Sequence, residues 1–126
     1  MFLFLDDDRT PDQVTWVNDV RYTNSHWNVV KSYDEFVSFI EEFGIPSLVS
    51  FDHDLADEHY EAVHLDRDLP YEKYSEKTGV SCARWLLNYC VEKNMKFPEY
   101  LVHSMNPIGK YNIEQEIESY MRHFDI

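Results

Sequence analysis

The chain has 126 residues, of which 44% are hydrophobic and only three are glycine, so we expect one domain with a substantial core rather than a disordered or fibrous chain. It carries 11 basic and 24 acidic residues, a formal net charge of −13. Such a surface repels phosphate backbones and anionic membranes, so neither duplex DNA nor a membrane is an expected partner. No segment approaches the roughly 20 apolar residues that span a bilayer, and the apolar start is too short for a signal peptide. We therefore expect a cytoplasmic protein.

The sequence predicts short strands separated by helices. Apolar runs without clean alternation are typical of strands that are covered on both faces. Residues 10–26 fit either a short helix or an ordered loop, and the polar segment 56–77 fits an insertion that covers the site. The predicted strands are 2–5, 27–30, 47–51 and 100–104. The first predicted helix begins after Ser32 and stops at Gly44, and the other two cover 80–93 and 113–124. Asn112 and Gln115 can cap the last of these helices.

This order of elements predicts an α/β domain with an open parallel sheet in three layers. Right-handed crossovers would place helices on both faces of the sheet. Cys82 and Cys90 lie in one predicted helix, about 12 Å apart along its axis, which is too far for a disulfide. We expect a single domain over 1–126 with two reduced thiols in its core.

Polar clusters follow three of the predicted strands. In parallel α/β sheets ligands bind outside the carboxyl ends of the strands. Acids at the ends of neighbouring strands, about 5 Å apart, would repel one another unless a hard cation such as Mg²⁺ or Mn²⁺ neutralised them. The alternative is that these acids only cap loops. The clusters are Asp6-Asp7-Asp8, Asp52-His53-Asp54 and His103-Ser104-Met105-Asn106.

Several side chains in and beside these clusters suit phosphate chemistry. His53 and His103 can act as general acid and base near neutral pH, or be structural. An extended backbone would point Asp52 and Asp54 to one side and His53 to the other. Ser104 can donate to a phosphoryl oxygen or simply end its strand. The loop 106–112 precedes a predicted helix N-terminus, which favours an anion, so the candidate phosphate ligands are Arg9, Asn106, Gly109 and Lys110.

Two weaker signals fall in the segment 56–77. His59 and His64 lie among acids and suggest zinc, but their spacing does not place both on one helical face, so a solvated acidic loop is the better interpretation. Tyrosines in the segment can stack on a base or cover the edge of the core. They are Tyr60, Tyr71 and Tyr74.

Four segments of the sequence carry a resemblance to a known family: LFLDDDRTP, SFDHDL, Thr78-Gly79 and VHSMNPIGKYNI. With them the sequence resembles the cyclic-phosphate processing receiver-like domains, which are divergent relatives of response-regulator receivers. The resemblance implies strand order 2-1-3-4 and a role in opening cyclic phosphates, such as 2′,3′-cyclic ends of RNA. By position, Asp6 and Asp7 match the metal-binding acidic pair of receivers, Asp52 the phosphoacceptor and Ser104 the hydroxyl residue after strand four. The family's own motif supplies His53, Asp54, His103 and Asn106. A receiver's fifth strand with its lysine has no counterpart here unless Lys110 substitutes.

Three functions follow from these observations. The first is a metal-dependent phosphoesterase in which Asp6, Asp7 and Asp52 hold Mg²⁺ or Mn²⁺ and His103 or His53 protonates the leaving ribose oxygen, or in which Asp52 attacks directly. Its partner would be a nucleotide or RNA terminus bearing a cyclic phosphate. The second is a non-catalytic receiver-like module that binds a phosphorylated ligand or a partner protein. The third, an acidic decoy for a basic protein surface, would not need acids focused at strand ends.

Overall fold

The structure is a computed structural model that describes residues 1–55 and 78–126. The predicted insertion, with His59, His64 and the three tyrosines, lies outside the described residues. The elements in chain order are β1 (Phe2–Leu5), the short 3₁₀ helix η1 (Pro11–Gln13), α1 (Arg21–Asn24), β2 (Trp27–Val30), α2 (Tyr33–Phe43), β3 (Leu48–Phe51), α5 (Gly79–Lys93), β4 (Glu99–Val102) and α6 (Pro107–Phe124).

The strands form one parallel sheet in the order β2-β1-β3-β4, so the predicted α/β class and strand order are confirmed. The central strands β1 and β3 are aligned with Leu5 opposite Phe51, and β4 continues the register with Val102 opposite Phe51. The three strands therefore end side by side. None of the described helices combines the length with the apolar character that crossing a membrane requires.

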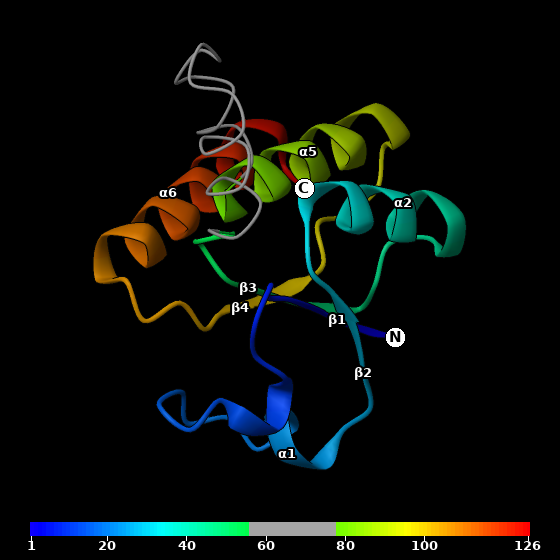
Figure 1. The fold of residues 1–126 in the computed structure, drawn as a ribbon. Coiled ribbons are helices and arrows are strands. Elements are labelled where there is room, and N and C mark those ends of the chain that lie inside the picture. Colours follow the sequence, from blue (N-terminus) through cyan, green and yellow to red (C-terminus); the bar gives the residue numbers. More distant parts are fainter. Residues whose placement is uncertain (56–77) are drawn as a thin grey trace, which may run out of the picture.

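The two faces of the sheet are covered very differently (Figure 1). The three long helices α2, α5 and α6 lie on one face, and the segment that carries η1 and α1 lies on the other. Right-handed crossovers explain this division, because the connection from β1 to β2 runs across the sheet in the opposite direction to the connections that lead to β3 and β4. The ambiguous segment 10–26 thus forms short helices and ordered loop, and it supplies the third layer.

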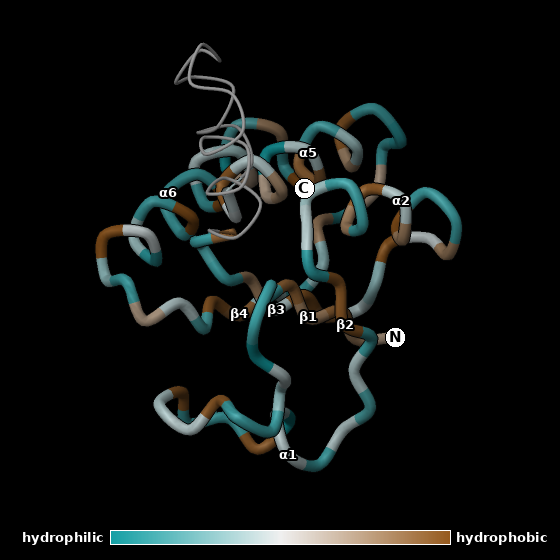
Figure 2. Tube along the Cα trace, in the orientation of Figure 1, coloured by the Kyte–Doolittle hydropathy of each residue, from teal (hydrophilic) through white to brown (hydrophobic). Residues whose placement is uncertain are grey.

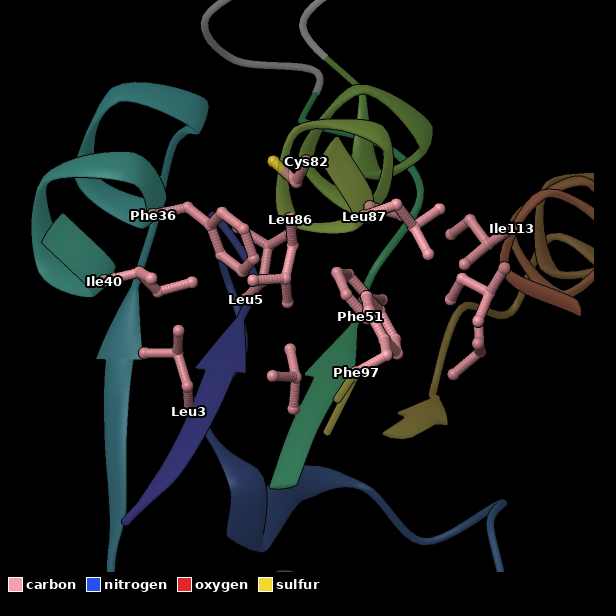
Figure 3. Close-up of a cluster of buried hydrophobic side chains, with 14 of the residues drawn as sticks. Leu3, Leu5, Phe36, Ile40, Phe51, Cys82, Leu86, Leu87, Phe97 and Ile113 are labelled. Carbon is pink, nitrogen blue, oxygen red and sulfur yellow. The ribbon is translucent and has the colours of Figure 1, made fainter. Parts of the chain in front are cut away.

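The main core lies between the sheet and the long helices. Figure 2 shows hydrophobic residues concentrated along the strands. In Figure 3 side chains from β1, β3 and the three helices point toward one another in this layer, among them Leu5, Phe36, Phe51, Leu86 and Ile113. Cys82 and Cys90 are buried and free, as predicted. A second cluster lies on the opposite face and consists of Phe4, Val14, Tyr22, Trp27 and Leu48.

Helix α6 begins at Pro107, so the prediction that it starts at Ile113 after a loop was wrong. The side chain of Asn106 is the N-cap, and its Oδ1 accepts hydrogen bonds from the backbone N–H of Ile108 and Gly109, both at 3.1 Å. The first turns of α6 do not continue the apolar stripe from which the helix was predicted. Their apolar residues Ile108 and Tyr111 are 73% and 60% exposed and do not face the core. Pro107 at the first helical position is the sequence signal that marks the true start.

The cap predicts unequal effects of two Asn-to-Ala substitutions. Asn106→Ala leaves two helix N–H groups without their acceptor, so the free energy of unfolding should fall by about 1 kcal/mol. Asn112→Ala, at an exposed position inside the helix, should have no effect or stabilise slightly, because alanine has the higher helix propensity. Urea titration of both variants measures the difference. Equal losses, or a larger loss for Asn112→Ala, would contradict the assigned cap.

Candidate functional site

The register of the sheet brings Asp6, Asp52 and His103 together. Each is the first residue after its strand, and the backbone N–H groups of Asp52 and His103 still donate to Leu5 and Phe51 as in the strands. Side chains alternate along an extended chain, so all three lie on the same side of the sheet as Phe4. Their ligand atoms all lie within 4.8 Å of one another, and all three side chains are buried. We call these three residues the strand-end cluster.

Asp6 is the fully charged member of the strand-end cluster. Its Oδ1 accepts backbone N–H groups of Asp8 and Arg9, both at 2.9 Å, and its Oδ2 lies 3.0 Å from Nε2 of His103. Burial alone would raise the pKa of Asp6, but the hydrogen bonds from His103 and the two amides outweigh it and lower that pKa. The carboxylate is therefore held in one orientation as an acceptor.

Asp52 has much weaker support. Within the described part of the chain, the one hydrogen bond of its carboxylate is the one that Oδ1 accepts from the backbone N–H of His53, at 2.9 Å. Burial, and then repulsion by the Asp6 carboxylate, raise the pKa of Asp52 to about 7. Two neighbouring carboxylates with pKa values pushed apart are typical of functional sites. Asp52 is thus the member of the cluster that responds to a proton or a cation near neutral pH.

Arg9 supplies a positive charge beside both carboxylates. Its Nε is 3.4 Å from Oδ2 of Asp6, and its Nη2 is 4.0 Å from Oδ1 of Asp52. The guanidinium lies over the indole of Trp16, 5.0 Å from the ring centroid. Its Nη1 is buried and has no hydrogen-bond partner among the residues that the structure describes. A buried donor without a partner is costly, so this atom is suited to bind an anion that enters the site.

His103 is enclosed on every side. Its ring stacks on Phe4 with the centroids 4.3 Å apart, its Nδ1 lies 2.6 Å from Oγ of Ser50, and its backbone oxygen accepts Nε1–H of Trp16 at 2.8 Å. Burial lowers the pKa of His103, although the contact with Asp6 opposes this shift. The imidazole is therefore a neutral, fixed group with both nitrogens occupied.

His53 and Asp54 form a second, more accessible pair. Nδ1 of His53 lies 2.7 Å from Oδ1 of Asp54, whose side chain is 57% exposed. The expectation that Asp52 and Asp54 point to one side and His53 to the other was wrong, because the chain bends at His53 and the Asp54 carboxylate turns to the imidazole. A Cβ at position 109 would lie 2.5 Å from Cγ of His53, so Gly109 makes room for this ring at the start of α6.

The remaining predicted site residues lie around the cluster without joining it. Asp7 is half-buried and contributes no atom to the group of three ligands, as expected when side chains alternate after Asp6. Ser104 is buried, and its Oγ accepts the backbone N–H of Asn106 at 3.1 Å. Asn106 and Gly109 are engaged in the helix cap. Lys110 is half-buried on α6 and makes no ion pair with the described residues.

The strand-end cluster fits a divalent cation. Two carboxylates and one imidazole offer donor atoms close enough to share one ion. Burial, and then the charge of Asp6, keep the pKa of Asp52 raised although Arg9 lies nearby, so a further positive charge would favour its ionised form. Carboxylate oxygens suit Mg²⁺ and Mn²⁺, whereas an imidazole ligand would favour softer ions.

Three residues of the site were missed by sequence reasoning. Ser50 and Tyr22 form a buried hydrogen bond of 2.7 Å between their hydroxyl groups, and Ser50 contacts His103. Trp16 contacts both Arg9 and His103 from the segment 10–26. A signal for Ser50 existed, because it is the polar residue inside an apolar strand, two positions before Asp52 and so on the same face. No comparable signal marked Tyr22 or Trp16.

The raised pKa of Asp52 predicts a pH-dependent stability. Between the ordinary value of 3.8 and about 7 the folded protein binds more protons at Asp52 than the unfolded protein does. The free energy of unfolding should therefore fall as pH rises toward 8, and Asp52→Asn should remove this loss. We expect the stability of Asp52→Asn relative to wild type to rise by about 1–2 kcal/mol between pH 5 and pH 8, measured by urea unfolding with chelator present. Parallel profiles for the two proteins would contradict the prediction.

Comparison with known proteins identifies a family. The family model of the cyclic-phosphate processing receiver domain matches residues 1–119. No curated protein and no solved structure matches the chain. The matched region contains the complete sheet, the strand-end cluster and most of α6. With this coverage, and with the parallel sheet in order 2-1-3-4, the chain belongs to the cyclic-phosphate processing receiver domain family.

Proposed function

We propose that the protein is a cation-dependent phosphoesterase that opens a cyclic phosphate, at a 2′,3′-cyclic RNA end or in a cyclic nucleotide. The observation that supports this proposal is the meeting of Asp6, Asp52 and Arg9 at the strand ends, with the guanidinium within 4.0 Å of both carboxylates. Family membership supplies the substrate class, cyclic phosphates. The overall charge of −13 requires that an anionic substrate find its positive charge locally, as it would here.

The proposed cation ligands are Asp6 and Asp52. Asp7 lies beside them in the sequence and is the second acid of the pair that matches the metal-binding pair of receivers. Mg²⁺ or Mn²⁺ bound there would polarise the phosphoryl oxygens and offset the negative charge that develops on them. Ligation requires Asp52 to be ionised, and its pKa of about 7 means that a proton and the cation compete for it near neutral pH.

Arg9 is the proposed phosphate ligand. Stacking on Trp16 restricts the guanidinium, and Nη1 has no partner among the described residues, so it can donate to a phosphoryl oxygen without breaking an existing bond. Ser104 accepts a backbone N–H, which leaves its own hydroxyl hydrogen for the phosphate. Lys110 and the first turn of α6, with Asn106 and Gly109, are proposed to contribute positive potential at the same edge.

His53 is the proposed general acid, in preference to His103, whose two nitrogens face Asp6 and Ser50. Asp54 accepts Nδ1–H of His53 and would stabilise the imidazolium. Nε2–H can then give its proton to the ribose oxygen as the bond from that oxygen to phosphorus breaks. A water oxygen forms the new bond to phosphorus, and that water releases one proton to the solvent. Attack by Asp52 itself is the other route, and it requires the ionised form of a carboxyl group with a pKa of about 7.

A non-catalytic module that binds a phosphorylated ligand is the second candidate. One observation favours it: Arg9 already lies beside Asp6 and Asp52, so phosphate could be held by the guanidinium with no cation and no turnover. Under this function Asp52→Asn would keep ligand binding. Under the phosphoesterase function the same variant would lose activity by orders of magnitude.

The decisive assay is ring opening. We expect wild type with MgCl₂ or MnCl₂ to convert 2′,3′-cyclic nucleotides or cyclic dinucleotides into phosphomonoesters or linear products, followed by ³¹P NMR and chromatography. His53→Gln should lower kcat by about 10²–10⁴-fold because the general acid is lost. His123→Gln, the same change at an exposed position near the end of α6, is the matched control and should be unaffected. Absence of turnover across the panel with cation bound would refute the phosphoesterase function.

Cation binding has its own readout in thermal stability. A ligand that binds only the folded state raises Tm, so MgCl₂ or MnCl₂ should stabilise wild type, and more strongly at pH 8 than at pH 6 because Asp52 must be ionised. Asp6→Asn should abolish the shift, whereas Glu118→Gln, an exposed acid on α6, should retain it. A shift that survives in Asp6→Asn would place the cation elsewhere.

A further inference from the structure

Four buried side chains form a continuous hydrogen-bonded chain that ends in the strand-end cluster. The hydroxyl of Tyr22 lies 2.7 Å from Oγ of Ser50, which lies 2.6 Å from Nδ1 of His103. Nε2 of the same imidazole lies 3.0 Å from Oδ2 of Asp6. Tyr22 is only 2% exposed and the other three are fully enclosed. This series of hydrogen bonds lies on the sheet face that α1 covers, away from the main core.

The hydrogen atoms of this chain have one arrangement that satisfies every donor. The Asp6 carboxylate accepts two backbone N–H groups at Oδ1 and can only accept at Oδ2, so the facing nitrogen of His103 must carry the proton. A neutral imidazole with its proton on Nε2 then accepts at Nδ1 from the Ser50 hydroxyl. Ser50 in turn accepts from the Tyr22 hydroxyl.

The reverse arrangement is poorer at both ends. A proton on Nδ1 would turn the lone pair of Nε2 toward the Asp6 carboxylate, so two acceptors would face each other at 3.0 Å. With Ser50 then accepting from His103, one of the two hydroxyl hydrogens of Ser50 and Tyr22 would have no acceptor within this network, in a buried position where an unsatisfied donor is costly. A 180° flip of the ring does not avoid the choice, because it would place carbon atoms against Ser50 and Asp6 and lose both hydrogen bonds. Smaller rotations would break the parallel stacking on Phe4, where the interplanar angle is 9°.

We propose that Ser50 and Tyr22 are positioning residues that hold the proton of His103 on Nε2, so that His103 is a hydrogen-bond donor to Asp6 and not a cation ligand. A divalent cation at the cluster is then bound through the oxygen atoms of Asp6 and Asp52 alone. Such an all-oxygen set selects hard ions such as Mg²⁺ over ions that prefer nitrogen, such as Zn²⁺. The part that concerns the cation rests on the proposed function, whereas the part that concerns the proton does not.

The experiment is ¹⁵N NMR of the His103 imidazole in the full chain, without divalent cation and then with saturating MgCl₂. We expect the Nε2–H form in both conditions. The matched variants are Ser50→Thr and Ser50→Val. The two new side chains have nearly the same size and shape, but threonine keeps the hydroxyl group and valine has a methyl group in its place. Ser50→Val should move the Nδ1 resonance toward that of an imidazole nitrogen with no donor, and it should weaken Mg²⁺ binding about tenfold relative to Ser50→Thr. Tyr22→Phe, which leaves the bond from Ser50 to His103 intact, should weaken Mg²⁺ binding by less than Ser50→Val.

Several results would overturn the inference. They are the Nδ1–H form in wild type, loss of the Nε2 proton when Mg²⁺ binds, and identical Nδ1 shifts in Ser50→Val and Ser50→Thr. The wild-type spectra decide the tautomer even if a variant fails to fold. If the spectra agree with the inference but no cyclic phosphate is opened, the proposed function fails and the inference stands. If cyclic phosphate is opened while Nε2 is bound to the cation, the inference about His103 fails and the proposed function stands.

Discussion

The site depends on the register of three parallel strands. Because Leu5, Phe51 and Val102 are aligned across β1, β3 and β4, the residues that follow them must lie side by side at one edge of the sheet. Alternation of side chains then directs Asp6, Asp52 and His103 to the same face. A shift of one residue in any strand would move its polar side chain to the opposite face and its neighbour into the cluster. The apolar residues of the strands, which fix that register by burial, therefore also fix the chemistry.

Unequal support of two buried carboxylates gives them different properties. Asp6 accepts two amides and faces His103, so its pKa is lowered despite burial. Among the described residues, Asp52 accepts one amide and lies at the limit of an ion pair with Arg9, so burial and the charge of Asp6 raise its pKa to about 7. The fold thus creates one permanent negative charge and one that depends on what else is bound. The positive charge next to them comes from Arg9, three residues after Asp6, and not from Lys110 on α6.

Sequence reasoning predicted the four strands, the long helices apart from the start of α6, and the gathering of acids at one edge of the sheet, because apolar runs and the polar clusters after them are local signals. It did not predict which members of each cluster meet. That outcome depends on register, and the same alternation that brings His103 to Asp6 separates Asp7 from the group. The bend at His53 was equally invisible, although it decides that Asp54 contacts the imidazole. Partners from outside the motifs, such as Tyr22, require the path of the segment 10–26, which is set by packing and not by periodicity.

The two histidines of the motifs differ in what surrounds their nitrogens. His103 has a partner on both nitrogens and a ring stacked against it, so it could give a proton to a ligand only by breaking a buried hydrogen bond to Asp6 or Ser50. Among the residues that the structure describes, His53 has a hydrogen-bond partner, Asp54, at Nδ1 alone. Its ring contacts Gly109, where any larger side chain would displace it. A group that must exchange a proton with a substrate requires one nitrogen that is not committed to the protein. These surroundings are consistent with His103 as a group that orients a carboxylate and with His53 as the general acid that we propose.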